Sequence, residues 1–217
     1  MAKINAINNQ SESLTIDPGA SGDSFVQFDI NGTGEFRIGV DDDASDAFKI
    51  SQGSALGTND TFTITEDGER NMALTPCYSG ELSAAAFNVT GDGTVCTVST
   101  NTETFDQSGD RTSTTFTAPV TGRYYLHWAV ASRNAQSSNN LSIVNIVTSN
   151  RTYQCGKLNQ YPLLAGTEGD YSFMVSVLAD MDAADTATCT LTVSGGGKVI
   201  DINATVYRTA SMGFLVC

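Results

Sequence analysis

Phe116-Thr-Ala-Pro-Val-Thr-Gly-Arg-Tyr-Tyr-Leu-His-Trp128 is the most informative run of this chain. Tyr124, Leu126 and Trp128 occupy every second position in it. Successive side chains of a β-strand point to opposite faces, so these three large side chains share one face. The run therefore predicts a strand that presents a broad apolar surface to a core.

The turn before that strand is marked by Pro119 and Gly122. Proline restricts φ and glycine tolerates a positive φ, so both residues favour a turn between two strands. The 217-residue chain as a whole has short alternating apolar stretches between turn formers, and it contains 20 glycines. Helical periodicity is not sustained over more than about ten residues. These features predict an all-β protein with room for one sizeable domain or two small ones.

The spacing of Phe116, Gly122 and the alternating residues after them resembles the signature of the C1q-like globular domain, a relative of the tumour necrosis factor jelly roll. The C-terminal run Ser211-Met-Gly-Phe-Leu-Val-Cys217 is similar to the last strand of such domains. The resemblance implies a C1q/TNF-like jelly-roll β-sandwich over residues 76–217. It further implies a homotrimer that binds other molecules and catalyses nothing.

Particular side chains are assigned from this resemblance. The opposite face of the strand carries Tyr125 and His127, and in such trimers that face commonly lines the threefold axis. We therefore expect Tyr125 and His127 to contact neighbouring subunits. The residues expected in the core are Phe116, Tyr124, Leu126, Trp128 and Phe214.

A different pattern fills residues 1–75, where the motif Phe-x-Ile recurs at 28–30, 36–38, 48–50 and 62–64. Turn formers separate the copies, so we predict short β-hairpin repeats. One such unit buries only two large side chains, which hardly offsets about 1–2 kcal/mol of backbone entropy per residue. Three chains around a common axis would complete its core. The trimer contacts expected in this region are Phe28, Ile30, Phe36 and Ile38.

Residues 35–65 resemble a segment of bacteriophage tail-fibre and tailspike proteins, through Asp-Ala-Phe-Lys-Ile-Ser at 46–51 and Leu-Gly-Thr-Asn-Asp at 56–60. This resemblance implies a trimeric virion protein made in the host cytoplasm. Residues 1–75 would trimerise and anchor it to other virion proteins of the capsid or tail. The N-terminal residues contain no apolar run of the kind found in a signal peptide.

Composition excludes several classes of partner. A net charge of −13 argues against nucleic-acid binding, which needs clustered basic residues. No stretch is apolar enough for membrane insertion. The five cysteines have no Cys-x-x-Cys spacing and are expected to be small buried hydrophobes, with their thiol state left open.

Candidate chemistry is sparse. The clustered carboxylates Asp41, Asp43 and Asp46 are calcium candidates, but the EF-hand pattern fails and a solvated turn is the alternative. His127 is the only histidine and no Gly-x-Ser-x-Gly elbow accompanies it, so we expect a structural histidine. We therefore predict no catalytic residue, no cofactor and no enzyme activity.

Recognition is expected on loops, because rigid scaffolds commonly present binding residues there. Residues 132–140 and 148–153 are polar and would form a surface for a host glycan or protein. A variable solvated loop is the alternative. The ligand-loop candidates are Arg133, Asn134, Gln136, Asn139, Arg151 and Tyr153.

Three functions remain open at this point. The first is a phage fibre or appendage that displays the jelly roll for host attachment. The second is a capsid decoration protein that stabilises the head shell. The third is a polysaccharide depolymerase fragment, which would need a cleft with paired carboxylates about 5–10 Å apart.

Overall fold

A computed structural model of the protein describes residues 16, 18–19, 21–30, 35–160, 169–204 and 208–217. The chain divides into two compact units, residues 1–74 and 75–217, which are treated separately below. This division lies one residue before the boundary expected from the sequence. Among the described residues there is no helix with the length and apolar character needed to span a membrane.

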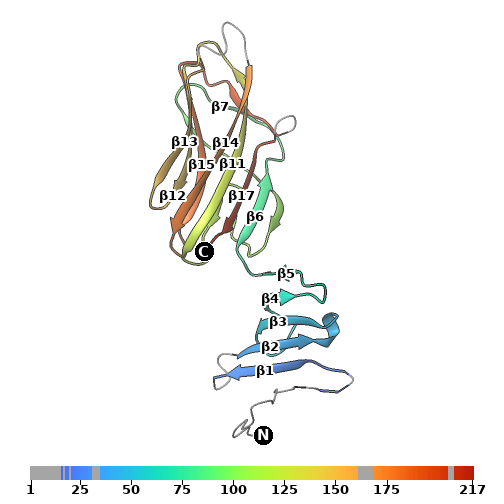
Figure 1. Ribbon diagram of the computed structural model, residues 1–217. Coiled ribbons are helices and arrows are strands. Elements are labelled where there is room, and N and C mark those ends of the chain that lie inside the picture. The colour runs from blue at the N-terminus through green and yellow to red at the C-terminus, as the bar shows by residue number, and fades with distance from the viewer. Residues whose placement is uncertain (1–15, 17, 20, 31–34, 161–168, 205–207) are drawn as a thin grey trace. The chain divides into compact units, whose positions relative to one another are not determined.

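The first unit is a five-stranded antiparallel meander in which neighbouring strands follow one another in sequence (Figure 1). A single turn of 3₁₀ helix, Asp42–Ala44, links its second and third strands. Its strands are β1 (Ser24–Asp29), β2 (Glu35–Asp41), β3 (Ala47–Gln52), β4 (Asp60–Ile64) and β5 (Arg70–Asn71).

The Phe-x-Ile motifs line up across this meander. Ile38 of β2 lies opposite Ile50 of β3, which in turn lies opposite Phe62 of β4. Because paired residues of adjacent strands point to the same side, the motifs form one continuous apolar face of the first sheet. Its residues are Val26, Phe28, Phe36, Ile38, Val40, Phe48, Ile50, Phe62 and Ile64.

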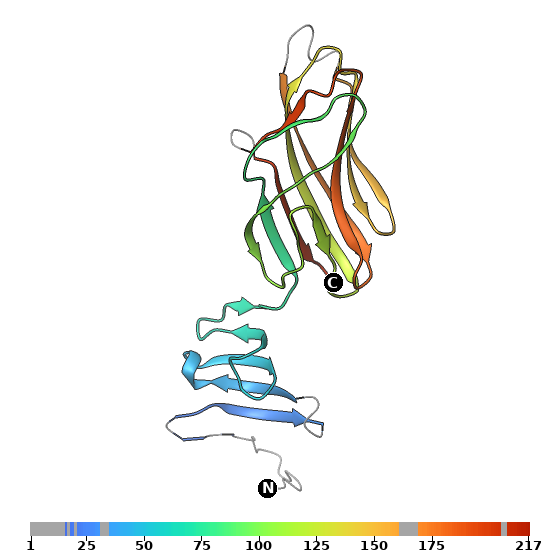
Figure 2. The same cartoon turned by 180° about the vertical axis from the view of Figure 1, so that it is seen from behind.

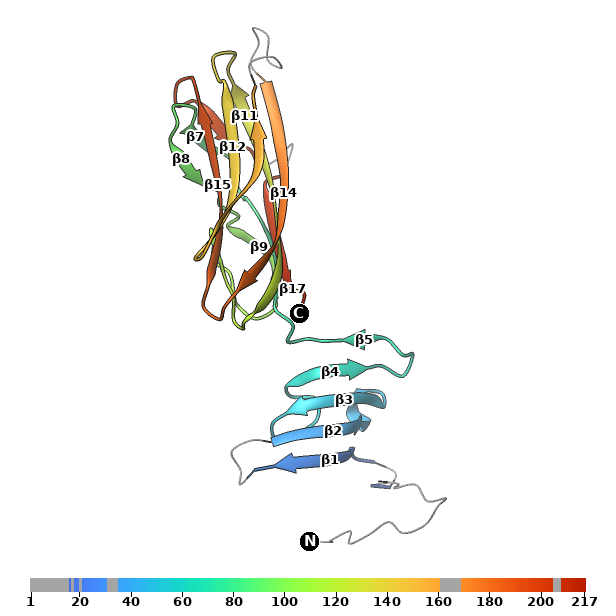
Figure 3. The same cartoon turned by 60° about the vertical axis from the view of Figure 1, so that its left-hand side comes forward.

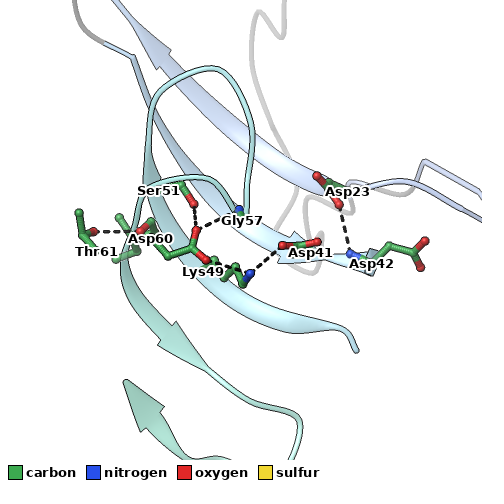
Figure 4. Close-up of polar contacts among 9 residues, drawn as sticks. Asp23, Asp41, Asp42, Lys49, Ser51, Gly57, Asp60 and Thr61 are labelled. Atoms are coloured by element: carbon green, nitrogen blue, oxygen red, sulfur yellow. Dashed lines mark hydrogen bonds and ion pairs between the residues drawn. The ribbon is translucent and has the colours of Figure 1, made fainter. Parts of the chain in front are cut away.

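The other face of the first sheet buries charge. The Nζ atom of Lys49 lies 2.8 Å from Asp41 Oδ2 and 2.9 Å from Asp60 Oδ2, as Figure 4 shows. Lys49 and Asp41 are only 7% and 4% exposed. Asp60 also accepts a hydrogen bond from the Gly57 amide at 2.9 Å and one from the Ser51 hydroxyl. Buried charges are tolerated when they are paired in this way.

This arrangement corrects the calcium hypothesis for Asp41, Asp43 and Asp46. Asp41 points inward to Lys49, whereas Asp43 and Asp46 are exposed on the turn that follows β2. Ser45 and Asp46 both take positive φ values, 54° and 57°, which reverse the chain tightly at that turn. In the part of the chain that the structure describes, no three acidic, histidine or cysteine side chains gather around a metal position.

The second unit consists of two antiparallel sheets packed face to face. One sheet has the order β10-β15-β12-β13, with β8 also paired to β15, and the other has the order β7-β16-β11-β17-β6-β9, with β14 paired to β11. Figure 3 shows β12 and β15 of one layer beside β14 and β17 of the other. The strands are β6 (Cys77–Glu81), β7 (Ala86–Thr90), β8 (Val95–Thr97), β9 (Thr102–Asp106), β10 (Thr115–Thr117), β11 (Gly122–Ala135), β12 (Leu141–Thr148), β13 (Thr152–Leu158), β14 (Gly169–Met181), β15 (Thr186–Ser194), β16 (Ile200–Ile202) and β17 (Ala210–Leu215).

The last strand of the unit lies inside its sheet. β17 pairs with β11 on one side and with β6, the first strand of the unit, on the other (Figure 1, and from behind Figure 2). Two face-to-face antiparallel sheets joined by such long-range pairings are a jelly-roll sandwich. The prediction of an all-β protein with a C-terminal jelly roll is confirmed.

The core between the two sheets is built on the inner face of β11. Tyr124, Leu126 and Trp128 are no more than 2% exposed, as is Phe116 of β10. The Phe116 ring stacks on the Tyr78 ring with their centroids 4.9 Å apart. Aromatic rings at this separation add to the free energy gained from area burial.

Phe214 is not part of this core, so its sequence assignment was wrong. Its side chain is 44% exposed and faces outward beside Tyr125, whose ring centroid is 5.3 Å away. The inward position belongs to its neighbour Gly213. A Cβ atom on Gly213 would come within 2.6 Å of the Tyr78 ring, so Tyr78 fills the space that a larger residue would need.

Truncating the centre of this core should destabilise the second unit. Leu126→Ala removes a fully buried side chain and leaves a cavity, so we expect the free energy of unfolding to fall by about 2–5 kcal/mol. Urea unfolding followed by the fluorescence of Trp128, the only tryptophan, measures this change. Val120→Ala, which truncates a side chain that is 45% exposed, is the control and should change stability by less than about 0.5 kcal/mol. Equal effects of the two variants would contradict the assignment of the core.

The charge cluster gives the first unit a defined pH dependence. Burial opposes ionisation of Asp60, but hydrogen bonds from Ser51, Lys49 and Gly57 outweigh it and hold the pKa below 3.8. Burial likewise opposes the charged form of Lys49, yet the two carboxylates raise its pKa above 10.5. A carboxyl with a depressed folded-state pKa stops stabilising the fold as the pH falls through that pKa. A lysine with a raised pKa stops doing so as the pH rises through it.

We therefore expect Asp60→Asn to lower the free energy of unfolding of the first unit most at neutral pH. The difference from the wild type should close as the pH falls below 3.8. Thermal unfolding by far-UV circular dichroism measures it, and Trp128 fluorescence reports the second unit as an internal control. A difference that does not change with pH would show that folding does not shift the pKa of Asp60.

Candidate functional site

The outer face of the β11 sheet brings Tyr125 and His127 into an apolar surface. Tyr125 lies between Leu178 of β14 and Phe214 of β17 in the strand register. Cross-strand neighbours on one face of a sheet are in reach of one another. The surface therefore continues across three adjacent strands.

Several apolar side chains of this surface are largely exposed to solvent. Met174 is 80% exposed, Leu178 is 54% exposed and Phe105 of β9 is 48% exposed. Single exposed apolar residues are ordinary, but contiguous ones mark contact surfaces. We call this surface the outer apolar patch; its members are Phe105, Tyr125, Met174, Leu178, Met212 and Phe214.

His127 belongs to the same face. Its ring lies parallel to the Tyr125 ring, with the centroids 6.5 Å apart, and Ser176 and Met212 lie opposite it on the flanking strands. Burial lowers the pKa of His127, which favours the neutral form of the imidazole. A neutral ring among apolar neighbours suits a contact surface.

The four interface candidates of the first unit lie on or beside the apolar face of the first sheet. Phe28, Phe36 and Ile30, which follows β1, are 59%, 47% and 75% exposed. Ile38 lies in the same face and is half-buried. Each unit thus presents one large apolar surface to solvent.

The predicted loop at residues 132–140 is shorter than expected. β11 continues to Ala135, so Arg133 and Asn134 belong to a strand, and Nε of Arg133 lies 3.7 Å from Asp170 Oδ2. Asn139 is fully buried: its Oδ1 accepts a hydrogen bond from the Gln136 amide at 2.8 Å, and its Nδ2 donates to the Gly91 carbonyl. The prediction of Asn139 as a ligand residue was therefore wrong, because the side chain holds the turn together.

Arg151 and Tyr153 line a hollow of about 270 Å³. The Arg151 guanidinium lies over the Tyr153 ring, 5.8 Å from its centroid. The remaining lining residues are Asn150, Asp180, Met181 and Asp182. Met181 pairs with Gly122, so this hollow lies where β11 begins.

Asn134 and Gln136 line a second hollow of about 390 Å³, where β11 ends. The loop candidates therefore do not form one surface. The two hollows lie at opposite ends of β11, separated by the length over which β11 pairs with the thirteen-residue strand β14. Sequence reasoning missed four lining residues of this second hollow. They are Phe87, Asn88, Val199 and Asp201.

No protein-family model and no curated protein matches the chain. Among solved structures, the globular domain of a zebrafish complement 1qA protein is similar, with 13% identity and a TM-score of 0.46 over 65% of this chain and 98% of that one. The Eiger TNF of S. frugiperda matches with 10% identity and a TM-score of 0.43, over 66% of this chain and 92% of its own. Murine APRIL matches with 10% identity and a TM-score of 0.43, over 64% and 99%. These similarities are too distant to carry function, and the jelly roll of the second unit is defined by its own strand order.

Proposed function

We propose that this chain is a non-enzymatic structural protein of a bacteriophage virion. It forms a homotrimeric fibre or appendage that displays the jelly-roll unit for attachment to a host surface. The observation that carries the proposal is that each unit presents a large exposed apolar face. The phage assignment itself draws on the likeness of residues 35–65 to tail-fibre segments.

The first sheet needs a second layer. Secondary-structure layers are stable when their apolar faces pack against another layer. In a single chain the face formed by the Phe-x-Ile motifs is exposed at Val26, Phe28, Phe36 and Val40 and only half-buried at its other residues. Burying apolar area stabilises a protein by roughly 25 cal/mol per Å². Three copies with these faces turned toward a common axis would supply the missing layer.

In the second unit, the outer apolar patch could pack against other copies in the same way. Its central residues Tyr125 and Phe214 already pack against each other, and Leu178 extends the surface on the next strand. A surface of this kind would be covered by equivalent surfaces of two other copies. Each unit would then form threefold contacts through its own apolar surface.

A trimer would strengthen attachment to a host surface. Three equivalent sites on one rigid assembly raise the effective affinity for a surface that bears many receptors by orders of magnitude. The proposal gives this binding role to the jelly-roll unit and gives the contact with other virion proteins to the first unit. No residue is assigned a catalytic role.

Charges placed in either apolar face should disrupt the assembly. We expect Ile38→Asp and Tyr125→Asp to shift the protein from trimer toward monomer in size-exclusion chromatography with multi-angle light scattering, because each would bury three like charges near one axis. Val95→Asp is the matched control, since Val95 is 62% exposed on the other sheet. Circular dichroism verifies that the second unit of each variant is folded. A monomeric wild type would refute the trimer, and trimers that withstand both changes would refute the assignment of these two faces as its contacts.

The location on the particle is tested independently. Immunogold labelling of intact virions with antibody against this chain should mark the tail tip or a head appendage. Label spread over the capsid faces would assign the chain to capsid decoration instead. Absence of the chain from purified particles, by mass spectrometry, would contradict a virion role altogether.

A further inference from the structure

We propose that the hollow between β7, β16 and β11 binds a neutral sugar ring, with Phe87 as its stacking platform. This inference rests on the proposed attachment function, because it names the class of ligand that the jelly-roll unit would bind. The hollow holds about 390 Å³, which is within the range of about 300–1,000 Å³ of small-molecule sites.

Two β-bulges build the hollow, one on each strand that flanks β16. Ile200 and Ile202 of β16 pair with Thr90 and Ala86 of β7, so three residues of β7 face a single residue of β16. On the other side, the register of β11 against β14 shifts between Ser132 and Ala135. Bulges bend a strand and redirect its side chains, and they are frequent beside functional sites.

Both bulges are held by one carboxylate. Asp201, the central residue of β16, is only 6% exposed. Its Oδ1 accepts a hydrogen bond from the Asn88 amide at 2.8 Å, and its Oδ2 accepts one from Asn134 Nδ2 at 2.7 Å. Asn88 and Asn134 have φ values of 54° and 59°, a conformation that residues other than glycine adopt infrequently. Asp201 thus positions the hollow while its own two oxygens are already engaged.

The bulge in β7 leaves a large aromatic side chain on the edge of the hollow. Phe87 is 69% exposed, although it lies in a strand. An aromatic face that is open to solvent beside polar groups suits a ligand with an apolar face of its own. The C–H face of a pyranose ring is such a surface, and stacking on Phe87 would remove both from water.

The polar groups around Phe87 match the hydroxyls of a sugar. Within the described part of the chain, the side-chain amides of Asn88 and Gln136 have no hydrogen-bond partner. Each amide offers two donors and one acceptor oxygen, and the Oδ1 atom of Asn134 adds another acceptor. Adjacent hydroxyls of a sugar act as donors and acceptors at once, so they can use both kinds of group.

The charge of the lining selects a neutral ligand. Its described residues include no lysine or arginine to pair with a sulfate, a phosphate or a sialic acid carboxylate. The single carboxylate is satisfied by Asn88 and Asn134, so the site lacks a free anionic oxygen for a cation. A neutral hexose or N-acetylhexosamine within a surface glycan fits these conditions.

The test uses the full-length protein and saturation-transfer NMR. The probes are neutral oligosaccharides of glucose, galactose, mannose, N-acetylglucosamine and N-acetylgalactosamine, with sialylated and sulfated oligosaccharides alongside. We expect at least one neutral sugar to bind. Phe87→Ala should weaken that binding by about tenfold or more, because the stacking surface is lost.

Two further variants separate stacking from general hydrophobicity. Phe87→Trp keeps an aromatic face and should retain binding, whereas Phe87→Leu keeps an apolar side chain and should weaken binding as Phe87→Ala does. Arg151→Ala, in the hollow at the other end of β11, should leave the affinity for the neutral sugar unchanged. Binding of charged sugars only, binding unaffected by Phe87→Ala, or no binding at all would overturn the inference.

Light scattering on the same samples keeps the two proposals apart. A trimer that binds no neutral sugar would remove the sugar site and leave the trimeric attachment function standing. A monomer that binds a neutral sugar through Phe87 would refute the trimer and leave the sugar site standing.

Discussion

Alternation along β11 is the constraint on which the second unit depends. The strand pairs with β14 over most of its length and with β17 over residues 124–129, and every second residue of that stretch enters the core. Tyr124 and Leu126 are completely buried, whereas their neighbours Tyr125 and His127 lie in the outer face. A register shift of one residue would exchange the two sets. The same strand therefore specifies both the inside of the sandwich and the surface proposed for assembly.

In the first unit, unlike the second, the charged side chains lie on the buried face of the sheet and the apolar side chains lie on the more exposed face. Its buried face carries the Lys49 ion pairs, and its exposed face carries the Phe-x-Ile motifs. Pairing Lys49 with both Asp41 and Asp60 ties three consecutive strands together through one side chain. Such a network specifies the register of the meander, while the larger share of hydrophobic stabilisation would come from neighbouring copies.

The site proposed for sugar binding arises where the regular alternation of β11 ends. Past Ser132 the strand bulges, and the bulge in β7 meets it across β16. Asp201 stabilises both irregularities with one buried carboxylate. Regular pairing thus builds the core and the outer apolar patch, and local departures from it create a hollow.

Much of the fold was accessible from the sequence, because period-two patterns report directly on which side chains share a face. The strand containing Tyr124 and Trp128 and the strands containing the Phe-x-Ile motifs followed from that periodicity alone. Phe214 was misassigned because the inward position in β17 belongs to Gly213, and only the contact with Tyr78 reveals this. The loop at 132–140 was overestimated because its polar residues continue a paired strand.

Local pattern was therefore sufficient for the strands that carry alternating apolar residues, but it did not predict β13, whose first residues were expected in a loop. Local pattern could not predict the second hollow, because Asp201 is 113 positions from Asn88 and 67 positions from Asn134 in the sequence. Alternation is a property of neighbouring residues, whereas a hollow built by two bulges depends on which distant strands pair. The pairing of β16 between β7 and β11 is decided by the packing of the whole sandwich.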